Sequence, residues 1–127
     1  MRTVNTNALL LSSRGHGIID YFAGIGMMAL PFALELRLTS EVAHWLSVSA
    51  GVGLVVYSTL TNYPLGVARI IPFKVHLFFD LAAALVFVST PFVFQWDGLV
   101  AAYYFVMAAA VIIVVVLTTT DDAGRQP

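Results

Sequence analysis

The sequence predicts an all-α, polytopic membrane protein with four transmembrane helices arranged as two tandem two-helix repeats. Of its 127 residues, 60% are hydrophobic and only 10% are charged, a composition far from that of a soluble globular domain. Four apolar segments alternate with short polar stretches, and about twenty residues at a rise of ~1.5 Å each cover the ~30 Å hydrocarbon core of a bilayer. Ionisable residues also recur at the same spacing in two of these segments, which indicates an internal repeat.

The four helices are expected at residues 15–34, 42–61, 74–94 and 99–119. The first repeat then covers residues 15–61, a linker covers 62–73, and the second repeat covers 74–119, between tails at 1–14 and 120–127. Ser40 is predicted to cap the second helix. Ser49 and Gly53 lie four residues apart on this helix, which predicts a closely packed face. Tyr63, Ile70, Ile71 and Phe73 in the linker are predicted to lie at the membrane interface.

The basic residues predict the orientation of the helices. An even number of spans places both termini and the linker on one side of the membrane. That side carries five basic residues, and the other side carries only Arg37. The five are Arg2, Arg14, Arg69, Lys74 and Arg125. Because basic residues are enriched on the cytoplasmic side, both termini are predicted to be cytoplasmic.

A His-x-x-x-Asp pair begins the first helix, as His16 and Asp20, and returns in the third helix as His76 and Asp80. Residues four apart share one face of a helix. If the symmetry axis between the repeats passes between these two helices, all four side chains converge near the cytoplasmic surface. Two imidazoles and two carboxylates could bind a divalent metal, ligate a haem through the imidazoles, or form a proton or ion pathway.

The depth of these pairs favours a structural interpretation. Each aspartate lies only about one helical turn, ~6 Å, beyond its histidine. A carboxylate near a helix N-terminus gains about 0.3–1 kcal/mol from the helix dipole. The penalty of about 2.5–3.5 kcal/mol for a charge at the bilayer centre shrinks toward the interface. We therefore expect a structural polar clamp, with a metal or haem site and a proton or ion pathway as the alternatives.

Pro31 and Pro91 are predicted to mark the far ends of the first and third helices. A proline inside a helix has no N–H to donate and leaves the carbonyl four residues earlier without its partner. The carbonyls of Met27 and Phe87 are the ones released, so each helix is expected to kink or stop there.

Several classes of function are disfavoured. The chain has no cysteine, which excludes disulfides, thiolate metal sites and thiol catalysis. Its net charge of −1 and its scattered basic residues do not predict nucleic-acid binding. No catalytic triad order, phosphate-binding loop or nucleotide motif is present. The chain is predicted not to be an enzyme and to need no cofactor. Its expected partners are the lipid bilayer and either a second copy or other membrane proteins.

The chain resembles the SPW-repeat family of small bacterial and archaeal membrane proteins over residues 14–117. The family pattern is His, Asp four residues on, Gly four further, and then Ser-Pro-Trp. The two copies here are His16, Asp20, Gly24 and Leu30-Pro31-Phe32, and His76, Asp80, Ala84 and Thr90-Pro91-Phe92. The resemblance implies a four-helix protein of the bacterial cytoplasmic membrane and no particular activity. A structural or accessory component of that membrane is therefore the predicted function.

Overall fold

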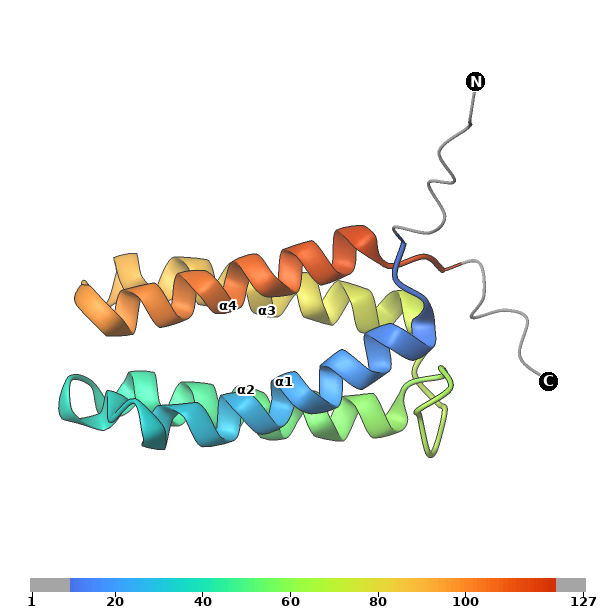
Figure 1. The fold of residues 1–127 in the computed structure, drawn as a ribbon, viewed down its shortest axis with the longest axis horizontal. Coiled ribbons are helices and arrows are strands. Elements are labelled where there is room, and N and C mark those ends of the chain that lie inside the picture. Colours follow the sequence, from blue (N-terminus) through green and yellow to red (C-terminus); the bar gives the residue numbers. More distant parts are fainter. Residues whose placement is uncertain (1–9, 121–127) are drawn as a thin grey trace, which may run out of the picture.

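The computed structural model describes residues 10–120 as an arrangement of helices (Figure 1). The elements are α1 (Ser13–Ala33), the short 3-10 helix η2 (Leu36–Leu38), α2 (Glu41–Leu60), α3 (Phe73–Val93) and α4 (Gly98–Leu117). Helix α1 packs beside α2, and α3 beside α4, so the chain forms two helical hairpins. The predicted all-α class is confirmed, and each helix begins and ends within two residues of its predicted bounds.

Three of the helices, α2, α3 and α4, are long and apolar enough to cross a membrane. Helix α1 has 21 residues but is not among these candidate spans, and Arg14 and Asp20 lower its hydropathy. The membrane-spanning character of the chain is therefore supported for three helices. The predicted tails fall mostly on residues 1–9 and 121–127, which lie outside the described part of the chain.

Helices α1 and α2 approach each other most closely at two glycines. A Cβ atom on Gly51 would lie 2.6 Å from the carbonyl oxygen of Gly24, so a larger residue there would force the backbones apart. The prediction that Ser49 and Gly53 form the packed face is wrong. Ser49 is exposed, and a Cβ on Gly53 would meet no atom within 4 Å. The spacing of small residues predicts a shared face but not which face meets the neighbouring helix.

Both prolines lie in the last turn of their helices, and a hydroxyl group satisfies each carbonyl that they release. Ser47 of α2 donates to the Met27 carbonyl at 2.8 Å. Thr90 donates to the Phe87 carbonyl at 3.0 Å, from within α3. The predicted cap is also present, since the Ser40 hydroxyl accepts from the backbone N–H of Ala43 at 3.1 Å.

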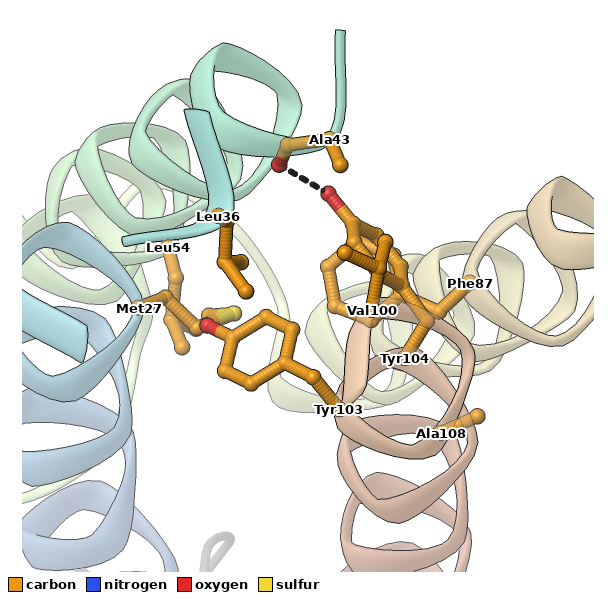
Figure 2. Packing of buried hydrophobic residues seen from close by; sticks show 9 residues of the cluster. All are labelled: Met27, Leu36, Ala43, Leu54, Phe87, Val100, Tyr103, Tyr104 and Ala108. Carbon is orange, nitrogen blue, oxygen red and sulfur yellow. Dashed lines mark hydrogen bonds between the residues drawn. The ribbon is translucent and has the colours of Figure 1, made fainter. Parts of the chain in front are cut away.

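Two tyrosines of α4 join the hairpins at the end far from the linker. The Tyr104 hydroxyl donates to the Ala43 carbonyl at 2.6 Å (Figure 2). Tyr103 points toward Met27 in Figure 2, and its hydroxyl lies 2.6 Å from that of Ser47. Because Ser47 uses its own proton on the Met27 carbonyl, Tyr103 is the donor of this bond. Hydrogen bonds thus run from α4 through α2 to α1.

The linker folds over the opposite end of the hairpins. Of the four residues predicted at the membrane interface, Tyr63 is only 1% exposed and Phe73 only 5%, so these two face the protein interior, whereas Ile70 is 70% exposed. The side chains of Tyr63 and Phe73 pack around His76, with ring centroids 5.4 and 6.0 Å from its imidazole. The outer surface of the linker is formed instead by residues such as Val67, which is 81% exposed. The linker therefore covers the histidines of the repeated motif.

Candidate metal centre

The two His-x-x-x-Asp pairs meet in one buried group beneath the linker. His16 and Asp20 come from α1, and His76 and Asp80 come from α3; together they are called the His–Asp cluster. None of the four is more than 5% exposed. Each offers one atom that could bind a metal, and these four atoms all lie within 4.8 Å of one another. From the sequence, the two pairs were expected to converge only if the symmetry axis between the repeats passes between the first and third helices. In the structure the two pairs do lie together.

Each imidazole lies closer to the carboxylate of the other hairpin than to that of its own helix. His16 Nε2 is 3.0 Å from an Asp80 oxygen and 3.2 Å from an Asp20 oxygen. His76 Nε2 is 3.0 Å from an Asp20 oxygen and 3.4 Å from an Asp80 oxygen. The cluster therefore connects the two hairpins and does not consist of two separate pairs along single helices.

A threonine fixes the proton on the outer nitrogen of each imidazole. Thr118 donates its only hydroxyl proton to the Val114 carbonyl at 2.6 Å. It lies 2.8 Å from His16 Nδ1 and must accept a proton there. Thr61 likewise donates to the Tyr57 carbonyl at 2.6 Å and lies 2.7 Å from His76 Nδ1. Both Nδ1 atoms consequently carry hydrogen, and both Nε2 atoms face the carboxylates.

His76 Nε2 is the least satisfied atom of the cluster. Two carboxylate oxygens lie within 3.4 Å of it, yet neither is aligned for a hydrogen bond, and the atom is fully buried. An imidazolium N–H at this position would be expected to point at one oxygen. An unprotonated Nε2 at this position would instead have a lone pair available to bind a cation shared with the carboxylates.

Two tyrosines hold the carboxylates. The Tyr57 hydroxyl donates to Asp80 Oδ1 at 2.5 Å, and the Tyr63 hydroxyl donates to Asp20 Oδ2 at 2.9 Å. Burial, together with the neighbouring carboxylate, raises the pKa of Tyr63, so its phenol keeps its proton and remains a donor. The tyrosines orient the oxygens of the cluster and add no charge to it.

The charge of the cluster requires compensation. With neutral imidazoles, two buried carboxylates leave a net charge of −2, and isolated buried charges are too costly to persist. Two additional protons on the imidazoles would balance this charge, and so would one divalent cation bound between the four side chains. These are the two chemical states that the geometry permits.

Four residues around the cluster were not identified from the sequence, namely Tyr57, Thr61, Tyr63 and Thr118. The threonines had a detectable signal, because each follows the last residue of a hairpin's second helix. An alignment of the second helices of the two repeats would have matched Thr61 with Thr118. The tyrosines had no such signal, since Tyr57 and Tyr63 occupy unrelated positions in the helix and in the linker.

No protein family, curated protein or solved structure matches the chain. The function is therefore argued from the chemistry of the His–Asp cluster.

Proposed function

We propose that this protein binds one divalent metal ion of the Zn²⁺ class through the His–Asp cluster and that the ion holds the two hairpins together. The observation that carries the proposal is His76, whose Nδ1 is bound to Thr61 while its buried Nε2 faces two carboxylates without an aligned hydrogen bond. Metal-binding histidines characteristically donate their second ring N–H to a neighbouring acceptor in this way.

The distances in the cluster support a four-coordinate ion. Zinc binds imidazole nitrogen and carboxylate oxygen at about 2.0–2.2 Å, which places tetrahedral ligands about 3.3–3.5 Å apart. The four Nε2-to-oxygen distances are 3.0, 3.0, 3.2 and 3.4 Å. Because the four candidate ligand atoms lie within 4.8 Å of one another, an ion would draw the most distant of them together and separate the closest nitrogen and oxygen atoms slightly. Two nitrogens and two carboxylate oxygens also suit zinc better than the hard ions magnesium and calcium.

A site with four protein ligands indicates a structural role. Catalytic zinc sites keep one position open for water, whereas structural sites are filled by side chains. Each hairpin contributes one histidine and one aspartate, so the ion would cross-link them. Haem fits poorly, because Asp80 Oδ2 lies within 3.4 Å of both Nε2 atoms, in the space that a porphyrin between the imidazoles would need. The proposal thus agrees with a structural or accessory component that has no catalytic activity.

Metal analysis of the purified protein tests this proposal. Protein equilibrated with Zn²⁺ and freed of excess should contain one zinc per chain, and Co²⁺ in its place should give the visible absorption of a tetrahedral complex. Asp80→Asn should abolish both signals, because it removes one charged ligand while keeping the shape of the side chain. His44→Ala is the matched control, since His44 is also a buried histidine but lies outside the cluster.

The result that would overturn the proposal is a folded protein without bound metal. If circular dichroism shows an intact helical protein and zinc content equals that of Asp80→Asn, the cluster is balanced by protons and not by a metal. Zinc that binds equally to wild type and Asp80→Asn would place the ion elsewhere and would also refute it.

We further propose that all four helices span the bacterial cytoplasmic membrane as two tandem repeats, with both termini cytoplasmic. The packing of α1 against α2 at Gly24 and Gly51 supports a fourth span. Because α1 lies along α2 at close contact, a membrane that α2 crosses would also surround α1. The chain lacks cysteine, so Thr39→Cys and Val67→Cys each create a single labelling site. A membrane-impermeant maleimide applied to whole cells should label Thr39→Cys only. Labelling of Val67→Cys as well, or in its place, would refute this orientation.

A further inference from the structure

A cavity of about 270 Å³ separates the hairpins directly beyond the carboxylates of the cluster. All four helices contribute to its wall, and most of the lining side chains are aliphatic, aromatic or methionine. At one end it is bounded by Asp20, Asp80 and Tyr57, which are its only polar lining residues. The cavity therefore has an apolar body and one polar end.

The cavity extends along the helices. Its wall on α1 extends from Ile19 to Met27, and its wall on α3 extends from Asp80 to Phe87. Seven residues cover about 10 Å along a helix. Its volume lies just below the ~300–1,000 Å³ typical of small-molecule sites. These dimensions suit one short hydrocarbon chain lying parallel to the helices.

The polar end presents hydrogen-bond acceptors and no free donor. Both aspartates offer carboxylate oxygens, and Tyr57 already uses its hydroxyl proton on Asp80. A bound molecule would therefore gain from a neutral group that donates a hydrogen bond. Asp80 Oδ1 and Asp20 Oδ1 each make one contact, to Tyr57 and to His16, and each keeps a further lone pair. A carboxylate head has no hydrogen to donate to these oxygens, and an alkane would leave the remaining lone pairs unused.

We propose that this cavity binds a single-chain amphiphile whose neutral head donates a hydrogen bond, as an aliphatic alcohol does. The chain lies among the apolar side chains and the hydroxyl group contacts the carboxylates of Asp20 and Asp80. The inference does not depend on a metal, because these carboxylates are acceptors whether the cluster holds zinc or protons.

Gly53 provides a way to fill the cavity without disturbing the helix packing. It lines the cavity, and a Cβ atom there would meet nothing within 4 Å. Gly53→Leu should occupy the space and exclude a ligand. Val52→Leu is the matched control, because Val52 precedes it on the same helix and is 47% exposed on the outer surface. Ala83→Leu fills the same cavity from α3 and replaces Gly53→Leu as the cavity-filling variant if Gly53→Leu does not fold.

The test measures unfolding temperature in detergent against increasing concentrations of 1-octanol, octane and octanoate. Subtracting the shift of Gly53→Leu from that of wild type cancels the partition of each probe into the micelles. The remaining shift should reach half its maximum at about tenfold lower concentration for 1-octanol than for octane, the effect of one hydrogen bond to a charged acceptor. Octanoate should give the weakest shift, and Val52→Leu should behave as wild type does.

Equal shifts for 1-octanol and octane would mean that the cavity accepts any hydrocarbon, and the proposed head-group recognition would be wrong. Equal shifts for wild type and Gly53→Leu would mean that the probes act elsewhere, and the site itself would be refuted. Either result can occur with zinc bound or absent, so failure here is distinguishable from failure of the metal proposal.

Discussion

Thr61→Val separates a metal site from a purely structural clamp. Valine keeps the shape of the threonine but removes the hydroxyl that accepts the proton of His76 Nδ1. A buried donor left without a partner costs about 1–3 kcal/mol. If His76 is a metal ligand, the loss falls on metal affinity, because partners that orient a ligating histidine contribute about 10–100-fold to that affinity. At about 1.4 kcal/mol per factor of ten, a 10–100-fold loss of metal affinity corresponds to about 1.4–2.8 kcal/mol, which agrees with the cost of the unpaired donor.

The assay is a competition titration of zinc between the protein and a chromophoric chelator, with unfolding measured in parallel on the metal-free protein. Thr59→Val is the matched control. Thr59 makes the same kind of bond to its own helix, donating to the Val56 carbonyl at 2.6 Å, but does not contact a histidine. We expect Thr61→Val to bind zinc 10–100-fold more weakly than Thr59→Val, again from the loss of the oriented ligand. Equal affinities in the two variants would refute the assignment of His76 as an oriented ligand.

Four further outcomes are expected. Gly51→Ala should lower the stability of the protein by about 1–3 kcal/mol, because its Cβ would overlap the Gly24 carbonyl, whereas Gly53→Ala should not; chemical unfolding of both variants checks this. Ser47→Ala should cost about 1–3 kcal/mol in the same assay, since it leaves the buried Tyr103 hydroxyl and Met27 carbonyl unpaired, and Ser49→Ala, at an exposed position, should have little effect. His44→Leu should raise the unfolding temperature, because neither buried nitrogen of His44 has a hydrogen-bond partner among the described residues; a fall would indicate an unseen partner. Zinc affinity should decrease as the pH falls, because about two protons compete with each ion for the two Nε2 atoms. A zinc affinity that does not change between about pH 5 and 7 would exclude histidine ligands.

The sequence was sufficient to predict the helices and their ends. Long apolar runs predicted the four helices, three of which are apolar enough to cross a membrane, Ser40 marked the start of α2, and the prolines marked the last turns of α1 and α3. These features are local, because caps and prolines act on backbone groups within one turn. The composition of a segment likewise shows whether it can cross a bilayer, whatever its neighbours are.

The sequence could not supply the contacts between helices. The spacing of His16 and Asp20 predicts that they share a face of α1, but the closer carboxylate to His16 proves to be that of Asp80. Tyr63 is amphipathic and would suit a membrane interface, yet the linker folds inward and its hydroxyl binds Asp20. Such pairings depend on how two hairpins dock, and periodicity within one helix carries no information about docking.

The two hairpins contact each other through different chemical groups at the two ends of their interface. At one end, Tyr103 and Tyr104 join the hairpins through neutral hydrogen bonds, while at the other end the contact consists of ionisable groups that cannot remain uncompensated. Between these ends lies the cavity. Removal of the compensating charge, whether metal or protons, would set Asp20 and Asp80 against each other and push the hairpins apart at the end where the cavity has its polar groups. Occupation of the cavity and the charge state of the cluster are therefore expected to be coupled through these two carboxylates.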